Sequence, residues 1–447
     1  MIVIASMPLI ETNRALAAPA VLKSALAQHG MTSVALDLNA EIYVKFQNSG
    51  HKKQLLDFFY NQVIHDEVVA EINSMIEHCT KKIIKHNPTL IGLSLFAKDC
   101  QVFTAWLCAS LKQIRPECVI VIGGPGIFQF DYAEKIKELG LINDYISGDG
   151  EESLIEYVRG NTTYPGINSW QWKPVTNLNT LPYPDYSDYD FYWYAEPSIP
   201  IVDSRGCVRA CEFCDVIEMW NKFQYKDADS IFAEMLHQIQ KHNINYFDFR
   251  SSISNGNLRE FRKLLTMIAD YNQSKFTSEQ IGWEGSFIVR PKNNHPESMW
   301  EILQKTNATL FLGIESVIPR IRNQIGKNFA NEDIDWHLAM GQKYNIKIVL
   351  LLISGYPTES LADYEATKQW FRDRKQFANN SVIKVNVSQA GIIYNTALYK
   401  NADKYNIINF HTGTNWVNKE LNIAVDQRTQ YHNELKNIIS KECNFLI

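Results

Sequence analysis

The sequence contains little cysteine, no long apolar run and no excess of positive charge. Only eight of its 447 residues are cysteine, too few for the disulfide framework of a small secreted protein. No stretch of about 18 consecutive apolar residues occurs, so we expect no transmembrane helix. The formal net charge of -5 gives no electrostatic footprint for nucleic acid. The first residues show neither a basic leader nor a cleavage site, so we expect a cytoplasmic protein without a signal peptide.

Apolar residues are plentiful enough to build large cores. Hydrophobic residues make up 45% of the chain and charged residues 21%, which is ordinary globular composition. At roughly 100–200 residues per domain, the length predicts two or three folded units. Five cysteines have no motif spacing, and we expect them to be free thiols of a reducing compartment: Cys79, Cys100, Cys108, Cys118 and Cys443.

Residues 1–159 alternate apolar strands with amphipathic helices, the pattern of a doubly wound, Rossmann-like parallel sheet. We expect strands at 2–5, 33–38, 90–94, 119–122 and 144–147, helices at 20–28, 102–114 and 152–158, and two helices within the helical stretch 55–85. Ligands of such sheets bind beyond the carboxyl ends of the strands. Glycine-rich runs follow two of these strands, and they permit either a close ligand or a tight turn.

Residues 160–198 interrupt this pattern. They are rich in proline, asparagine, aspartate and aromatic residues, and the Leu-Pro-Tyr-Pro string at 181–184 cannot lie inside a helix. We interpret this segment as an ordered linker that packs between domains, with its aromatic side chains serving as interface core.

A second series of strand–helix units begins at residue 199. We expect strands at 201–204, 246–250, 282–285, 309–313, 348–353 and 381–388, and helices at 228–242, 258–271, 296–305, 331–344 and 360–373. Six such units predict a partial (β/α)6 barrel over residues 199–390, whose active site would lie at the carboxyl ends of the strands. Residues 391–447 are then a C-terminal cap of unknown role with a helix at 434–441.

Three cysteines have a spacing that indicates chemistry. Cys207, Cys211 and Cys214 form a CxxxCxxC string directly after the first barrel strand. Three close thiolates suit a [4Fe–4S] cluster, and three ligands for four irons leave one iron open for catalysis. A structural zinc site or an electron-carrier cluster would need a fourth protein ligand, and the eleven histidines form no paired motif.

This string, with Phe213 before its last cysteine and a six-strand partial barrel around it, resembles the radical S-adenosylmethionine (SAM) superfamily. In that family the open iron binds SAM, and the reduced cluster cleaves it to a 5′-deoxyadenosyl radical that abstracts hydrogen from the substrate. The strings at 312–316 and 353–359 resemble the family's GIES and GxPxE segments. The resemblance implies SAM contacts at Phe213, Asp248, Ser286, Arg290, Glu315 and Gly355.

The N-terminal domain resembles the cobalamin-binding domain of the cobalamin-dependent members, and the likeness covers about residues 1–390. It rests on the GGP string at 123–125, the GDGEES string at 148–153 and the Leu-Pro-Tyr-Pro segment. The implied cobalamin contacts are Ser94, Gly123, Gly124, Pro125, Gly148 and Glu151. One departure is clear, because the loop at 6–11 has no DxHxxG motif and therefore offers no histidine beneath the cobalt.

The resemblance implies an enzyme that transfers a methyl group to an unactivated carbon of a small molecule or natural-product precursor, with flavodoxin or ferredoxin as reductant. A cobalamin-free radical SAM cyclisation or rearrangement with a vestigial N-terminal domain remains open. A non-catalytic iron–sulfur electron carrier or redox sensor is the alternative of another class. A nucleic-acid methylthiotransferase is disfavoured by the negative net charge. The sequence indicates neither the substrate nor the oligomeric state.

Overall fold

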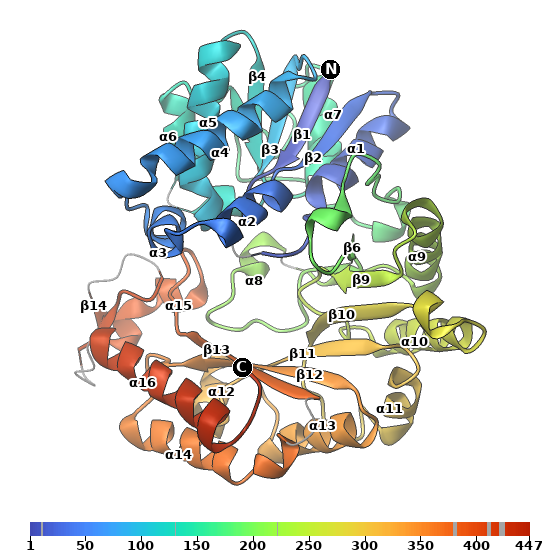
Figure 1. Cartoon of the computed structure of the whole chain (residues 1–447), viewed down its shortest axis with the longest axis vertical. Coiled ribbons are helices and arrows are strands. Elements are labelled where there is room, and N and C mark those ends of the chain that lie inside the picture. The colour runs from blue at the N-terminus through green and yellow to red at the C-terminus, as the bar shows by residue number, and fades with distance from the viewer. Residues whose placement is uncertain (10–11, 130, 221, 379–381, 409–412, 420–424) are drawn as a thin grey trace. The chain divides into compact units, whose positions relative to one another are not determined.

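The computed structural model describes residues 1–447 except 10–11, 130, 221, 379–381, 409–412 and 420–424. Two residues of the predicted 6–11 loop and the first residue of the strand predicted at 381–388 therefore lie outside the described residues. The chain divides into two compact units, Met1–Pro200 and Ile201–Ile447. Each unit contains a parallel β-sheet flanked by helices (Figure 1), which confirms the mixed α/β class.

The first unit is built on a five-stranded parallel sheet in the order β2-β1-β3-β4-β5. Its strands are almost wholly apolar because both faces of the sheet are covered. Every predicted strand is present within two residues of its expected limits. The strands are β1 (Ile2–Ser6), β2 (Ser33–Asp37), β3 (Leu90–Ser94), β4 (Val119–Gly123) and β5 (Asp144–Ile146).

Helices cover both faces of this sheet. Val3 and Ala5 of β1 point into one core, which contains residues of α4 and α5, whereas Ile2 and Ile4 point into a second core with residues of α1 and α7. Such alternation follows from the two-residue period of a strand. The helices are α1 (Ala18–Gln28), α2 (Asn39–Asn48), α3 (Lys52–Leu56), α4 (Asp66–Ile84), α5 (Gln101–Ile114), α6 (Tyr132–Glu138) and α7 (Gly150–Val158).

The aromatic segment 160–198 packs against the first unit. The ring of Trp170 stacks on Tyr145 with centroids 5.1 Å apart, and the Tyr194 hydroxyl donates a 2.9 Å hydrogen bond to the buried Asp37 carboxylate. Lys23 in α1 forms ion pairs with Asp185 and Asp188 at 3.2 and 2.6 Å. These contacts make the segment an ordered part of this unit.

The second unit contains a six-stranded sheet in the order β13-β12-β11-β10-β9-β6, and its neighbours from β9 to β13 are parallel. Because the spatial order follows the chain order, each strand is followed by a crossover to its neighbour, as the partial-barrel prediction requires. The strands are β6 (Ile199–Ile201), β9 (Tyr246–Phe249), β10 (Gly282–Phe287), β11 (Ala308–Glu315), β12 (Lys347–Ser354) and β13 (Ile383–Gln389).

The remaining strands form two short antiparallel hairpins, and helices cover the sheet. The hairpins pair β7 (Ser204–Arg205) with β8 (Gln224–Tyr225), and β14 (Ile407–Ile408) with β15 (Val417–Asn418). The helices are α8 (Val216–Met219), α9 (Ala228–His242), α10 (Leu258–Gln273), α11 (Glu297–Leu303), α12 (Pro319–Ile325), α13 (Asn331–Lys343), α14 (Leu361–Arg372), α15 (Ala397–Lys400) and α16 (Val425–Asn437). None of the described helices is long and apolar enough to cross a membrane.

One predicted barrel strand is wrong in its extent. The strand expected at 201–204 ends at Ile201, and Ser204 belongs to the β7–β8 hairpin instead. The reason lies in the buried Asp203 between them, whose carboxylate accepts a hydrogen bond from the Ser251 hydroxyl and whose carbonyl accepts one from the Lys226 amide at 2.8 Å. These bonds turn the chain out of the sheet immediately before the cysteine motif.

The C-terminal residues do not form one uniform cap. The helix predicted at 434–441 begins at Val425, packs beside α14 through stacked rings of Tyr364 and Tyr431, and adds an ion pair between Lys368 and Glu434. After it, the Leu446 carbonyl accepts a 2.8 Å hydrogen bond from the Val385 amide of β13. Helix α16 thus occupies the place of the helix that follows β13, and residues 391–424 are a long β13–α16 connection.

Two stacked, buried histidines predict acid sensitivity of the fold. The rings of His295 and His337 lie 5.2 Å apart, and His337 Nδ1 bonds the Asp333 carbonyl. Within the described chain, neither nitrogen of His295 has a hydrogen-bond partner. Burial lowers the pKa of His295 to about 3 and that of His337 to about 4, with Arg290 adding to the depression at His295.

Because both pKa values are depressed, the unfolded chain binds more protons than the folded chain below pH 6.5. Their contribution to stability is therefore complete above that pH and is lost progressively as the pH falls toward 3. Buried carboxyls such as Glu359 and Asp203, whose pKa burial raises to about 7, change the stability in the opposite sense over the same pH range. We therefore compare two proteins, and expect that lowering the pH from about 7.5 to about 5.5 changes the urea midpoint of unfolding less favourably in the wild type than in His337→Phe. An equal change in both proteins would contradict a contribution from these histidines.

Candidate functional site

The cysteine loop is shaped by a glycine that no other residue replaces without strain. Gly206 follows β7 with φ of +75°, in the left-handed region. A Cβ atom at this position would lie 2.7 Å from the carbonyl oxygen of Lys222, which belongs to the returning arm of the hairpin. The β7–β8 hairpin therefore fixes the position of the backbone immediately before Cys207.

The three motif cysteines lie together and are partly exposed, whereas the other five are buried. The Cys214 amide donates a 3.0 Å hydrogen bond to the Cys211 carbonyl, which closes the loop into a turn. Burial raises the pKa of the Cys211 thiol and raises that of Cys214 to about 12, and a charge on Cys207 would raise both further. Cys211 and Cys214 therefore need a positive centre nearby to become thiolates.

No group of three or more His, Cys, Asp or Glu side chains among the described residues is arranged to hold a single metal ion. The three thiols do not converge on one ion in this conformation. A cluster makes a different demand, since each cysteine binds a different iron. In their chemistry, three thiols from one loop are donors of the kind that a [4Fe–4S] cluster takes.

An apolar cluster supports the loop from below. Cys211 and Phe213 pack against it, and it contains residues from α12, the β12 turn and the β13–α16 connection, namely Ile321, Ile325, Tyr356, Ala390, Ile392, Leu398, Ala402, Tyr405, Ile407 and Trp416. Phe213 was predicted from its place before the last cysteine, and its ring packs against this cluster. Its backbone adjoins Cys214.

Glu315 ends β11 in an unusual backbone conformation. Its φ is +56°, and the pairing register with β12 shifts between Gly313 and Glu315. Its carboxylate forms a largely buried ion pair with Lys327 at 2.7 Å, and the same ammonium group donates to the Gly313 carbonyl at 2.6 Å. Lys327 was not identified from the sequence. The only local signal for it was the helix-ending glycine before it, Gly326, which caps α12.

Arg290, one of the predicted SAM contacts, follows β10. Its Nη2 atom donates to the carbonyls of Asn255 and Gly256 at 2.8 and 3.2 Å, while its buried Nε has no hydrogen-bond partner within the described residues. Burial, and then the nearby Arg209 of the cysteine loop, lower the pKa of Arg290. Two cations beside the cysteine loop suit an anionic ligand group.

Asp248 and Ser286 occupy the ends of neighbouring strands. The Asp248 carboxylate forms a 2.6 Å ion pair with Arg250. Ser286 is half-buried near the end of β10, and its carbonyl accepts a 2.9 Å hydrogen bond from the Ser254 amide. Both residues therefore lie at the edge where the resemblance predicts SAM contacts, and Asp248 already has a cationic partner.

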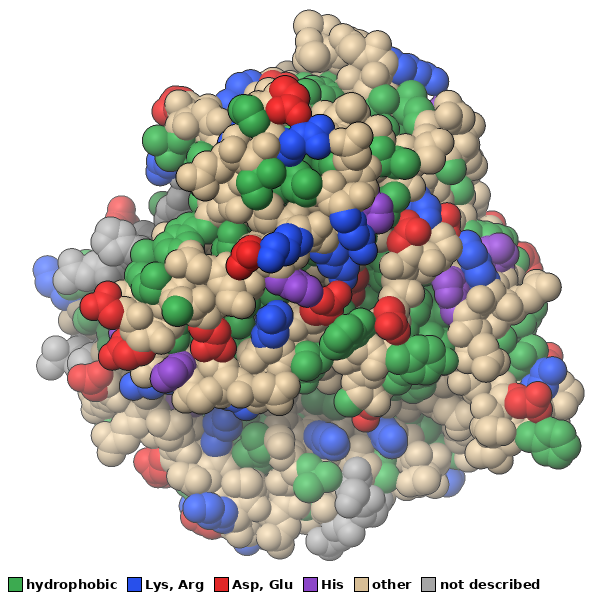
Figure 2. Space-filling model, turned by 45° about the horizontal axis from the view of Figure 1, so that its top comes forward, with side chains coloured by type: hydrophobic (Ala, Val, Ile, Leu, Met, Phe, Trp, Pro, Cys, Tyr) green, Lys and Arg blue, Asp and Glu red, His purple; other side chains and the backbone are tan. Residues whose placement is uncertain are grey.

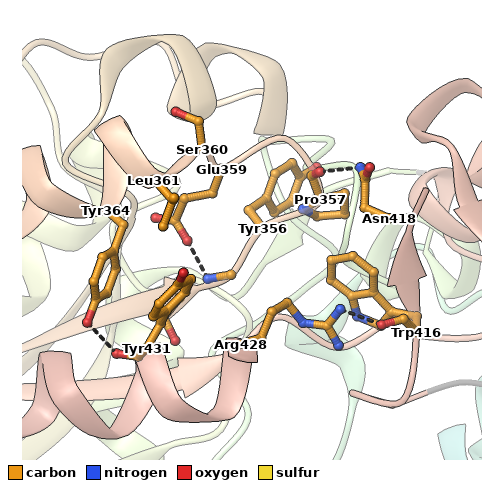
Figure 3. Close-up of a pocket in the computed structure, with 12 residues that line it drawn as sticks. Tyr356, Pro357, Glu359, Ser360, Leu361, Tyr364, Trp416, Asn418, Arg428 and Tyr431 are labelled. Atoms are coloured by element: carbon orange, nitrogen blue, oxygen red, sulfur yellow. Dashed lines mark hydrogen bonds between the residues drawn. The ribbon is translucent and has the colours of Figure 1, made fainter. Parts of the chain in front are cut away.

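The turn after β12 is closed by its own side chains, as Figure 3 shows. Gly355 has φ of +72°, and its amide donates to the carboxylate of Glu359, whose pKa burial raises to about 7. Asn418 donates a 2.7 Å hydrogen bond to the Pro357 carbonyl. The guanidinium of Arg428 stacks on Trp416 at 3.6 Å. The β13–α16 connection thus lines the pocket beside this turn.

The first unit gathers the predicted cobalamin contacts at the carboxyl edge of its sheet. A Cβ at Gly124 would lie 2.5 Å from the Leu95 carbonyl, and one at Gly148 would lie 2.1 Å from the Trp172 ring. These glycines therefore make room for the chain itself. The predicted contacts at this edge are Ser94, Gly123, Gly124, Pro125, Gly148 and Glu151, the last largely buried in the first turn of α7.

The chemistry of this edge fits a corrin only through apolar and backbone contacts. The loop after β1 is tied down by a hydrogen bond from the Leu9 amide to Asn39, and Asn39 also donates to the Thr12 carbonyl. Its described residues include no histidine. Directly after β3, Phe96 exposes about half of its side chain (53%). The exposed ring of Phe96 would give a corrin an apolar contact at this edge, and the described part of the β1 loop offers no imidazole.

Charged side chains of both signs are interspersed over the face shown in Figure 2. The Lys and Arg groups lie among Asp and Glu groups, so this face offers no continuous basic surface.

No protein-family model matches the chain. Among solved structures, it resembles the radical S-adenosylmethionine methyltransferase TsrM of Kitasatospora setae with cobalamin and a [4Fe–4S] cluster bound, with a TM-score of 0.65, 16% identity, and coverage of 92% of this chain and 76% of TsrM. It also resembles the cobalamin-dependent S-adenosylmethionine radical enzyme OxsB, with a TM-score of 0.67, 14% identity, and coverage of 91% of this chain and 60% of OxsB.

Two curated proteins are related in sequence. An uncharacterized methyltransferase of Pyrococcus horikoshii is 22% identical over 70% of this chain and 71% of its own length. The anaerobic magnesium-protoporphyrin IX monomethyl ester cyclase of Synechocystis is 21% identical over 45% of this chain and 42% of its own length. The structural neighbours include cobalamin-dependent radical SAM enzymes, so the predicted resemblance is confirmed for the fold.

Proposed function

We propose that this chain is a radical SAM enzyme that holds a [4Fe–4S] cluster with Cys207, Cys211 and Cys214. The observation that carries the proposal is one glycine-started loop with three partly exposed thiols, set in a fold shared with TsrM and OxsB. When bound, the cluster would supply the electron that cleaves SAM reductively to a 5′-deoxyadenosyl radical. An electron carrier would instead need a fourth protein ligand, whereas the motif supplies three cysteines.

The residues around the loop suit the parts of SAM. Arg290 and Arg209 would attract its carboxylate, and the backbone at Phe213 would lie along the adenine. Glu315, held by Lys327, would accept a hydrogen bond from the ammonium or ribose groups. The predicted contacts at Asp248, Ser286 and Gly355 remain part of this proposal.

We further propose that the first unit binds cobalamin at the carboxyl edge of its sheet. Bound there, cobalamin would supply a methyl group for transfer to an unactivated carbon of a small molecule, and flavodoxin or ferredoxin would supply electrons. The exposed ring of Phe96 and the backbone around Ser94 and Gly123 would contact the corrin. TsrM with cobalamin bound and the methyltransferase of Pyrococcus horikoshii support this choice.

One observation favours a cobalamin-free radical SAM reaction as the second candidate. The ring of Trp172 fills the space over Gly148 that a close ligand would need, and no histidine occurs in the described part of the β1 loop. The N-terminal sheet would then be a retained scaffold. The product would be a cyclised or rearranged molecule without a methyl group derived from SAM.

An anaerobic reconstitution tests both parts of this proposal. The protein is incubated with iron, sulfide and hydroxocobalamin, desalted, and examined by visible spectroscopy and iron analysis. We expect an iron–sulfur shoulder and a retained corrin band. Phe96→Asp should retain less corrin with the same iron content, whereas Phe276→Asp, which alters an exposed ring of the second unit, should retain both. A shoulder without a corrin band would favour the second candidate, and no shoulder would overturn the cluster.

A further inference from the structure

Glu212 lies inside the cysteine motif and contacts three separate parts of the second unit. Its amide donates a 3.1 Å hydrogen bond to the Ile325 carbonyl at the end of α12, and its carbonyl accepts a 2.7 Å bond from the Leu398 amide. Its carboxylate accepts hydrogen bonds from Tyr356 at 3.2 Å and Tyr405 at 2.6 Å. The residue between two cluster cysteines is therefore fixed at its backbone and at its side chain.

Two of these partners belong to the β13–α16 connection, which is itself firmly attached. Asn418 donates to the carbonyls of Pro357 and Tyr405 at 2.7 and 2.9 Å. Arg428 at the start of α16 donates to the carbonyls of Trp416 and Thr414, as Figure 3 shows for Trp416. The connection is thus bound both to the β12 turn and to α16, and it holds the cysteine loop against them.

The phenols of Tyr356 and Tyr405 are donors in this arrangement. Burial, followed by the charge of Glu212, raises the pKa of Tyr356, and burial with the hydrogen bond to Glu212 raises that of Tyr405. Both hydroxyls therefore keep their protons and offset part of the carboxylate charge. A charge one residue from Cys211 acts on any metal centre held there, because reduction adds negative charge to that centre.

We propose that Glu212 is a positioning residue that fixes the cluster loop and sets the reduction potential of the cluster through its balance with Tyr356 and Tyr405. This inference rests on the proposed function. The carboxylate disfavours the reduced cluster, and the two phenols moderate that effect by donating to it. Removal of the charge and removal of the phenols should therefore shift the potential in opposite directions.

The test measures the reduction potential of the reconstituted cluster by an EPR-monitored titration without substrate. Glu212→Gln keeps an acceptor but removes the charge, so the potential should become more positive. The double variant Y356F/Y405F keeps the charge but removes both donors, so the potential should become more negative. Iron content is measured in parallel for every protein.

Glu218→Gln is the matched control. Glu218 lies on α8, four residues beyond Cys214, and its carboxylate forms a partly exposed 2.8 Å ion pair with Lys400 of the same connection. An exposed pair is strongly screened, so this variant should leave the potential close to the wild-type value. Glu212→Asp retains the charge on a shorter side chain and should shift the potential less than Glu212→Gln.

The outcomes separate this inference from the function on which it rests. If the wild-type protein binds no cluster, the proposed function fails. If it binds a cluster whose potential moves in the same direction in Glu212→Gln and Y356F/Y405F, or does not move, Glu212 has only a structural role and the inference is overturned. Opposite shifts at equal iron content would support it.

Discussion

Replacement of Cys207, Cys211 and Cys214 by alanine together should reduce iron retention and 5′-deoxyadenosine formation to background. The physical reason is that the cysteine thiolates are the ligands that hold the irons of such a cluster, so a loop without them offers the cluster no ligand. The loop itself should still fold, because its shape depends on Gly206 and on backbone hydrogen bonds. Iron analysis and chromatography of SAM cleavage products under dithionite measure the effect.

Cys118→Ala is the matched control for this triple variant. Cys118 is a buried free thiol of the first unit, and its Sγ atom bonds only backbone carbonyls at 3.4 Å or more. Its loss should change neither the iron content nor SAM cleavage. Formation of 5′-deoxyadenosine by the triple variant at the wild-type rate would refute the assignment of the cluster ligands.

Lys327→Met should destabilise the second unit more than any surface substitution. Glu315 and Lys327 are both largely buried, and the ammonium group bonds both the carboxylate and the Gly313 carbonyl. Removal of the cation leaves a buried carboxylate without its charge partner, which typically costs about 3–5 kcal/mol of stability. The urea midpoint of unfolding measures this loss, and calorimetric titration with SAM measures the accompanying loss of affinity.

A double variant identifies the cause of this loss. In K327M/E315Q the stranded charge is absent, so we expect most of the stability to return while SAM affinity stays low. Lys343→Met provides the comparison, because Lys343 and Glu297 form an exposed ion pair and little change is expected there. A Lys327→Met protein as stable as the wild type would show that Glu315 does not depend on this ion pair.

The strands and the cysteine loop were predictable because their signals are local. A strand such as 90–94 is a short, mainly apolar run, and the motif cysteines are seven residues apart from first to last. Glu315 was also found from a local string. Its partner Lys327 was not, because twelve residues and a helix separate the two, and only the fold brings their charges together.

The missed elements are those whose hydrophobic pattern is weak. Only four of the ten residues of helix α2 are buried, and its polar residues balance its apolar ones. Its sequence therefore resembles that of a polar loop. Helix α16 begins nine residues before the predicted start, because its first two turns are almost wholly polar and are fixed by Arg428 and Tyr431 instead of by an apolar face.

The glycine runs illustrate a different limit of sequence reasoning. A glycine at 124 or 148 indicates that something lies close to the backbone, but it does not say what. In the structure the neighbours are the Leu95 carbonyl and the ring of Trp172, the latter 24 residues away from Gly148. Sequence alone cannot distinguish a neighbour supplied by the chain from one supplied by a ligand.

The bond between Val385 and Leu446 has a consequence for solubility. β13 is the last strand in its sheet order, and an exposed last strand is a template on which a second molecule can add a strand of its own. The final residues occupy part of that template, since Leu446 bridges Lys384 and accepts from the Val385 amide. Outward Lys384, Asn386 and Ser388 add polar side chains along the same strand. This pairing and these polar side chains leave β13 a poorer template for a strand from a second molecule.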